Sequence, residues 1–175
     1  MRTAECPGRH AKAIVPATFE TVTIMLDGEV AHRDSVGNHG VIGAGAVQWM
    51  TAGRGVVHSE MFPLLSTDEG NTCELFQIWM NLPASDKMVE PYFTMLWSEG
   101  IPVHRHVDGE GRSTDVTVIA GRYGDLVPPP PPPSSWASRP EADVAIWHVV
   151  MEPGAAIELP SADRGTARVV YVFEG

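Results

Sequence analysis

The residue types best suited to metal chemistry form a short pair. His58 and Glu60 flank a serine in the stretch GRGVVHSEM, and positions two apart on a strand point to the same side. An imidazole and a carboxylate on one face suit iron, manganese or zinc. Two donors alone bind a metal weakly, and a histidine that hydrogen-bonds to a carboxylate in a turn is the alternative. The pair therefore predicts a metal site only if further ligands join it.

A second pair, His104 and His106, has the same spacing and lies beside a polar loop, Asp108 to Ser113. Because histidines in exposed loops are common, we interpret this pair as solvated, with a metal site as the alternative. Glu20 opens the first apolar segment and fits either an inward carboxylate or a surface residue. The remaining histidines are isolated in sequence and are interpreted as structural or solvated: His10, His32, His39 and His148.

The elements around these residues read as short strands. In FETVTIML, Phe19 to Leu26, apolar residues alternate with threonines, which is the period of a half-buried strand. An Asp-Gly turn separates it from a second strand, Glu29 to Asp34. Glycines over 37–45 predict a loop, and 85–90 could hold one helical turn. Further strands are expected at 47–50, 56–62, 73–81, 115–120, 143–151 and 168–173. Short strands without a long helical period predict an antiparallel sandwich or barrel.

Six consecutive prolines, Pro128 to Pro133, interrupt this pattern. Proline has no backbone N–H to donate, so the run predicts polyproline II helix instead of sheet. A stiff spacer is the favoured interpretation, and a ligand for proline-binding modules is the alternative.

Composition limits the classes of function. The chain has 175 residues, 43% of them hydrophobic, and a formal net charge of -10. A negative charge of this size disfavours direct binding to nucleic acid or to anionic lipid. No phosphate-binding loop, nucleophile elbow or dinucleotide-binding glycine motif is found in the sequence.

Three features predict a cytoplasmic location. The two cysteines lie far apart and form no CxxC motif, which favours a reducing compartment. Residues 1–13 lack the apolar core of a signal peptide. No stretch reaches the roughly 18 apolar residues that a membrane helix needs.

A family resemblance covers roughly residues 19–120. The segments FETVTIMLDGEVAHRDSVGNHG and VIGAGAVQWMTAGRGVVHSEM resemble the signature region of the pirin family of the cupin superfamily. The phrase QWMTAGRGVVHSEM is the most specific part, and LFQIWMNLPASDKMVEPYF continues the match. The resemblance implies an all-β fold, with an antiparallel cupin (jelly-roll) barrel and a partial second cupin barrel.

The implied organisation has four parts, and relative to the family the chain is expected to be incomplete at both ends. These parts are an atypical N-terminal segment, a pirin N-terminal cupin domain, a proline-rich linker and the start of a C-terminal cupin domain, at 1–18, 19–122, 123–140 and 141–175.

The resemblance also implies chemistry. Pirins are similar to bicupins with one mononuclear iron held by three histidines and a glutamate, and several bacterial members act as quercetin 2,3-dioxygenases. By position, His58 and Glu60 would be metal ligands, with Glu60 also the catalytic residue. The family's His-x-His pair falls on Ile14 and Pro16, which cannot bind a metal. His10 would need a register shift to substitute. We therefore expect Fe²⁺ or another divalent metal to bind with reduced occupancy.

Two hypotheses about function remain open at this point, beside a fragment with no independent function. The first is a metal-dependent dioxygenase that acts on a flavonol-like aromatic ligand and has a degraded metal site. The second is a non-catalytic cupin that serves as a protein-interaction or transcription-cofactor-like module. Exposed strand edges would allow a homodimer in either case. Neither hypothesis involves direct contact with nucleic acid or a membrane.

Overall fold

The structure is a computed structural model that describes residues 12–14 and 16–175, with the backbone alone for 12–14. It divides into two compact units. The first runs to Ser98 and also includes residues 131–136, and the second comprises residues 99–130 and 137–175. These units are regions that are compact in themselves. The boundaries of the two cupin domains expected from the sequence remain a prediction.

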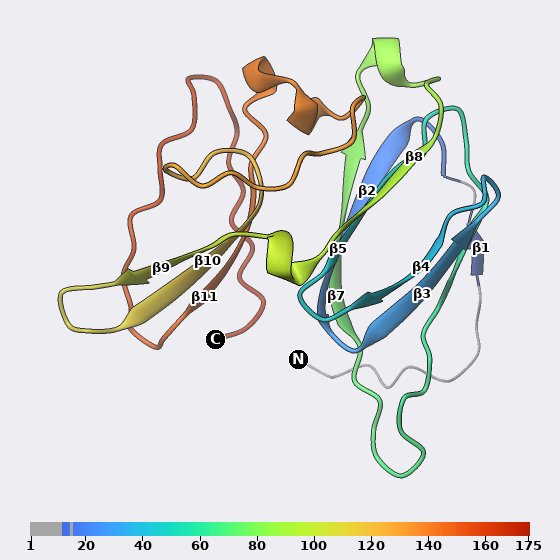
Figure 1. Cartoon of the computed structure of the whole chain (residues 1–175). Helices are drawn as coiled ribbons and strands as arrows, with labels where there is room; N and C mark the ends of the chain where they lie inside the picture. Colours follow the sequence, from blue (N-terminus) through green and yellow to red (C-terminus); the bar gives the residue numbers. More distant parts are fainter. Residues whose placement is uncertain (1–11, 15) are drawn as a thin grey trace. The chain divides into compact units, whose positions relative to one another are not determined.

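The first unit is built from two four-stranded antiparallel sheets (Figure 1). One sheet has the order β1-β6-β3-β4, and the other has the order β7-β2-β5-β8. The strands of the first sheet are β1 (Lys12–Ile14), β6 (His58–Met61), β3 (Glu29–Asp34) and β4 (His39–Gly43). Those of the second sheet are β7 (Glu74–Asn81), β2 (Phe19–Asp27), β5 (Val47–Thr51) and β8 (Tyr92–Leu96).

The core of the first unit lies on both faces of β2. On one face, Met25 packs with Val30 and Ile42 from the opposite sheet. On the other face, Val22 lies beside Trp49 of β5, and both side chains are fully buried. Burial on both faces explains why β2 and β5 contain few exposed residues.

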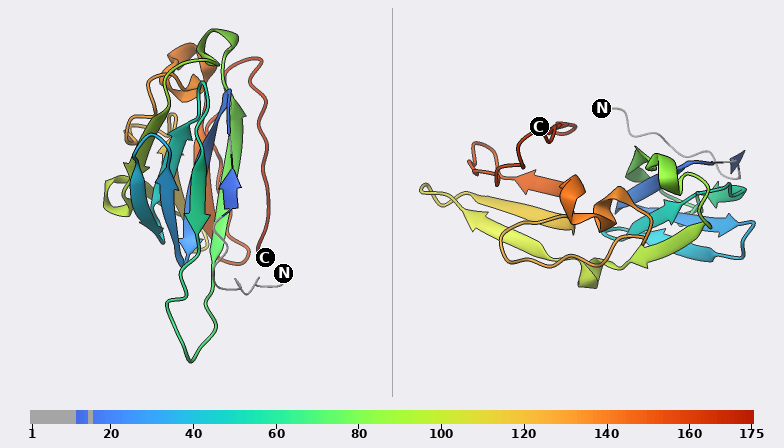
Figure 2. Two further views of the ribbon diagram at one scale, coloured as in Figure 1. Left: turned by 90° about the vertical axis from the view of Figure 1, so that its right-hand side faces the viewer. Right: turned by 90° about the horizontal axis from the view of Figure 1, so that it is seen from above.

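The second unit contains one three-stranded antiparallel sheet of order β11-β10-β9. β9 (Val103–Val107) and β10 (Ser113–Ala120) form a hairpin, and β11 (Ile146–Met151) lies along β10 (Figure 2). Val116, Val118 and Tyr123 form its core. The helical segments are four short 3₁₀ turns: η1 (Ala84–Asp86), η2 (Ser98–Gly100), η3 (Trp136–Ser138) and η4 (Pro140–Ala142). None of the described helices has the length and apolarity to cross a membrane.

The expected fold class is confirmed: the protein is all-β and antiparallel. The strands predicted at 19–26, 29–34 and 47–50 coincide with β2, β3 and β5 to within one residue. The loop predicted at 37–45 is wrong, because this segment contains β4, whose glycines lie in extended backbone paired with β3. β8 and β9 were not predicted. The strand predicted at 168–173 is also wrong, because these residues lie outside every strand and Val169 is 88% exposed.

The segment after the proline run covers the outer face of β2. Ser135 is fully buried, and its hydroxyl donates to Glu20 Oε1 at 2.8 Å. Trp136 donates its indole N–H to the backbone oxygen of Asn81 at 2.8 Å. Glu20 is therefore not a surface residue, but it is buried on the outer face of β2 and does not point inward toward the opposite sheet. Its neighbours on β5, Trp49 and Thr51, also donate to this carboxylate.

The turn before β6 depends on a glycine. Gly53 has a φ of +52°, and a Cβ added there would collide with the backbone oxygen of Val89. We expect Gly53→Ala to lower the free energy of unfolding by about 1–3 kcal/mol, because both the strained φ and the clash must be accommodated. Urea denaturation measures the loss. Gly43→Ala is the control, since a Cβ there meets nothing within 4 Å. Equal stability of the two variants would contradict this account.

Candidate metal centre

The register of β3 and β6 brings two histidines and two carboxylates together. His32 pairs with Glu60, and Asp34 pairs with His58. Directly opposite residues of an antiparallel pair point to the same face, and here that face is turned toward the second sheet. His32, His58 and Glu60 each offer a ligand atom, and these atoms lie within 4.8 Å of one another. The pair predicted from the sequence thus gains a third donor.

The candidate metal-ligand atoms are buried, and two of them lack a hydrogen-bond partner. Among the described residues, neither His58 Nδ1 nor Glu60 Oε1 has a hydrogen-bond partner. Burial raises the pKa of Glu60, and a hydrogen bond from Gln48 offsets part of this rise. Burial also lowers the pKa of His58, and the nearby His32 lowers it further. Neutral imidazoles and an under-satisfied carboxyl are suited to receive a cation, so the residues present fit a divalent metal.

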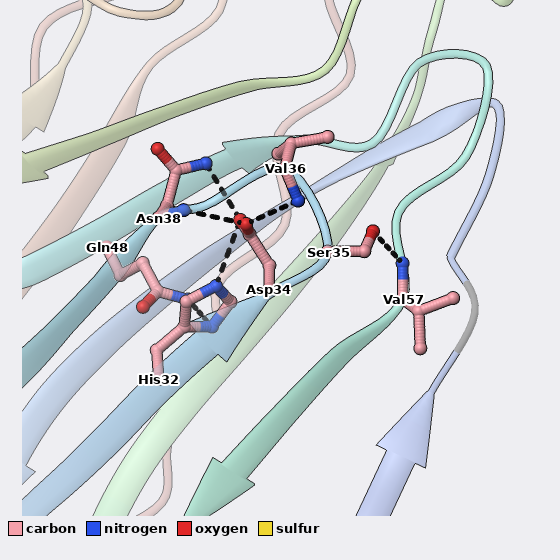
Figure 3. Close-up of polar contacts among 7 residues, drawn as sticks. All are labelled: His32, Asp34, Ser35, Val36, Asn38, Gln48 and Val57. Carbon is pink, nitrogen blue, oxygen red and sulfur yellow. Dashed lines mark hydrogen bonds and ion pairs between the residues drawn. The ribbon is translucent and has the colours of Figure 1, made fainter.

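Asp34 holds His32 in place (Figure 3). Its Oδ1 accepts the backbone N–H groups of Val36 and Asn38, and its Oδ2 accepts the side-chain amide of Asn38 at 2.8 Å. His32 Nε2 lies 3.4 Å from the same Oδ2. Burial by itself would raise the pKa of Asp34, but these hydrogen bonds together lower it below its usual value. The carboxylate is therefore an ionised, fixed acceptor for His32.

The second sheet supplies the opposite wall of the site. Gln48 of β5 places its amide nitrogen 3.4 Å from His32 Nδ1 (Figure 3). Phe93 of β8 stacks on the His32 ring with the ring centroids 4.9 Å apart. Burial lowers the pKa of His32, and the Asp34 carboxylate only partly counters this effect. The wall is thus apolar on one side of the imidazole and polar on the other.

The other residues singled out in the sequence lie apart from this cluster. His104 and His106 are on β9 of the second unit, where the His104 ring lies 5.1 Å from that of Tyr123. In the described part of the chain, no third donor joins them. His10 lies outside the described residues. The backbone register places Ile14 opposite His58, so β1 runs beside the cluster.

His32 is the residue that the sequence interpretation missed. It was interpreted as isolated in sequence and as structural or solvated, whereas the structure places it with His58 and Glu60. Local spacing could not find it, because the contact depends on the pairing of β3 with β6. The alternation in VAHRD was the available signal, since it puts His32 and Asp34 on the same face as the buried Val30.

Comparison with known proteins identifies the family. The Pirin family model matches residues 15–80. A Pseudomonas aeruginosa protein, provisionally named as a quercetin 2,3-dioxygenase, is 40% identical over 159 residues, which are 90% of this chain and 51% of the relative. This chain is a pirin-family cupin. Pirin-1 of Arabidopsis thaliana is 47% identical over 103 residues, covering 59% of this chain and 32% of the relative.

Solved structures support the same assignment at the level of the fold. The crystal structure of a quercetin 2,3-dioxygenase from Acinetobacter baumannii aligns with a TM-score of 0.61 at 37% identity. The alignment covers 70% of the pirin-family chain and 43% of that protein. The chain spans about half the length of the bacterial relative described above.

Proposed function

We propose that this pirin-family chain belongs to a divalent metal-dependent oxidoreductase of the quercetin 2,3-dioxygenase type. The observation that carries the proposal is that two buried atoms, His58 Nδ1 and Glu60 Oε1, lack hydrogen-bond partners among the described residues. These two residues would hold the ion. The names of the relatives support the type of reaction. Iron is the first choice of metal, and another divalent ion is the alternative.

When bound, the ion would supply Lewis-acid and redox chemistry toward dioxygen and a flavonol-like aromatic substrate. The chain's own contribution is to position the ligands of the ion and to shield the site from water. Phe93 provides an apolar surface beside His32, whose ring nitrogen lies within 4.8 Å of the ligand atoms of His58 and Glu60. Glu60 would have a second role: while one carboxylate oxygen holds the ion, the other can take a proton from a substrate hydroxyl. The non-catalytic interaction module stays an alternative hypothesis.

Turnover of quercetin tests the proposal. With Fe²⁺ added under air, we expect the protein to consume quercetin faster than the same concentration of free Fe²⁺. Glu60→Gln should lower this rate by about 100-fold or more, toward the rate of free metal, because it removes both a ligand and a proton acceptor. Absorbance loss of quercetin measures the rate.

The matched control is Glu74→Gln, which changes an exposed carboxylate at the start of β7 and should retain full activity. A Glu60→Gln variant that turns over quercetin as fast as the unchanged protein would refute the role of Glu60. Failure of the unchanged protein to exceed free Fe²⁺ would refute the proposed activity.

A further inference from the structure

The starting observation is the position of His32 in a site from which the family's His-x-His pair is missing. Ile14 and Pro16 occupy those two positions and carry no donor atom. His32 comes from a different strand, directly across from Glu60. Two donors that share a first-row metal ion through bonds of about 2.0–2.2 Å lie at most about 4.4 Å apart. The present separation, within 4.8 Å, therefore needs only a small rotation of the side chains.

Asp34 determines which nitrogen of His32 is available. Asp34 Oδ2 already accepts the amide of Asn38, and the carboxylate can only accept from His32 Nε2 as well. The ring proton consequently belongs on Nε2, and Nδ1 keeps its lone pair. The partner of Nδ1 in the structure is the Gln48 amide nitrogen at 3.4 Å, the same distance as that from Nε2 to Asp34 Oδ2. The contact with Gln48 is with a neutral amide and is the weaker of the two, because the contact with Asp34 is with a carboxylate.

We propose that His32 is the third metal ligand of this chain, through Nδ1, and that Asp34 is the residue that positions it. His32, His58 and Glu60 then form a set of two histidines and one carboxylate in place of the family's three histidines and one glutamate. Two histidines and one carboxylate are a ligand set that non-haem iron oxygenases use, so these three residues would suit iron. The carboxylate behind the imidazole follows the common arrangement in which a ligand histidine donates its second N–H to an acceptor.

This inference rests on the proposed function, because both require a metal at His58 and Glu60. The test uses Co²⁺ as the probe, since its visible absorption reports its ligands directly and does not depend on turnover. The unchanged chain should bind one Co²⁺ ion. His32→Ala should weaken binding by about 100-fold or more, beyond the roughly 10–100-fold typical of an outer-sphere partner. His39→Ala, an exposed histidine on β4, should leave the affinity unchanged.

A second pair of variants isolates the role of Asp34. Asp34→Asn and Asn38→Ala both disturb the turn that follows β3. In Asp34→Asn the amide oxygen should keep the two backbone N–H bonds of Val36 and Asn38, which turns the NH₂ group toward His32 Nε2. Only this variant then lacks an acceptor for His32, so only this variant should weaken Co²⁺ binding, by about 10–100-fold. Its Co²⁺ absorption spectrum should also change. Equal affinities of the two variants would overturn the positioning role.

His32 is buried and stacked on Phe93, so His32→Gln serves as a second variant that fills more of the space if His32→Ala does not fold. A measurement without mutation completes the test. In the Co²⁺-loaded chain, NMR should show strongly shifted ring signals from two histidines. The inference is overturned if only one histidine is shifted, or if both His32 variants bind Co²⁺ as tightly as the unchanged chain. Either result leaves the proposed metal site at His58 and Glu60 intact. Absence of Co²⁺ binding by the unchanged chain overturns both.

Discussion

Glu20→Ala is expected to lower the free energy of unfolding by about 3 kcal/mol or more. The carboxylate accepts the indole N–H of Trp49 at 2.7 Å and the hydroxyl of Ser135 at 2.8 Å. The buried indole N–H of Trp49 would lose this acceptor, and Ser135 would lose its hydrogen bond to the carboxylate. An unsatisfied buried group costs about 1–3 kcal/mol, and the cavity left by the truncated side chain adds to this cost. The substitution would also remove one of the hydrogen bonds that attach the segment after the proline run, while the bond from Trp136 to Asn81 remains. Urea denaturation at neutral pH measures the change in free energy.

Glu90→Ala is the matched control for this substitution. Its carboxylate pairs with Arg54 at 2.7 Å, but both side chains are mostly exposed, at 71% and 58%. An exposed ion pair contributes about 0–1 kcal/mol, so the control should remain close to the unchanged protein. If Glu20→Ala is no less stable than Glu90→Ala, the buried network contributes nothing measurable to the fold.

Glu20 also predicts how stability depends on pH. Burial raises its pKa, and hydrogen bonds from Ser135, Trp49 and other neutral donors offset part of this rise. Because the folded pKa lies above the unfolded one, the folded state binds more protons between the two values. The part of the Glu20 contribution that depends on protonation is therefore complete below its unfolded pKa of about 4.3 and is lost as the pH rises through the folded pKa. The hydrogen bonds from Trp49 and Ser135 are a separate contribution, which the Glu20→Ala variant measures at neutral pH. Glu20→Gln should lack this decline when unfolding is measured across that range.

Restoring the family's His-x-His pair is expected to give the largest gain in metal affinity. Ile14→His and Pro16→His together should raise Co²⁺ affinity by about 100-fold or more, because each added imidazole contributes a bond to an ion that is already partly held. The backbone register supports this expectation, since position 14 lies directly opposite His58. Competition with a chelator of known affinity measures the change.

The control for the restored pair is Ala17→His, which adds an imidazole one position beyond the motif and should change the affinity little. In the restored protein, His32→Ala should cost less than in the unchanged chain, because the new histidines share the role of His32. If the double substitution leaves the affinity as it was, the assignment of Ile14 and Pro16 to the family's ligand positions is wrong.

Much of the fold and half of the candidate site were predictable from local sequence. The alternation in FETVTIML and the turn at Asp27-Gly28 were sufficient to predict β2 and β3, because side chains alternate between the faces of a strand. The spacing of His58 and Glu60 placed both on one face for the same reason. β4 was missed because its glycines resemble a loop until pairing with β3 is known.

The contacts that complete the site and secure its surroundings depended on tertiary structure. His32 meets Glu60 only because β3 pairs with β6 in one particular register. Ser135 reaches Glu20 across 115 positions of the chain. Local sequence can state which face of a strand a residue occupies, but it does not specify which strand lies alongside, because pairing is decided by burial of the whole sheet. For this chain, the pairing of β3 with β6 decides whether two or three candidate metal ligands lie together.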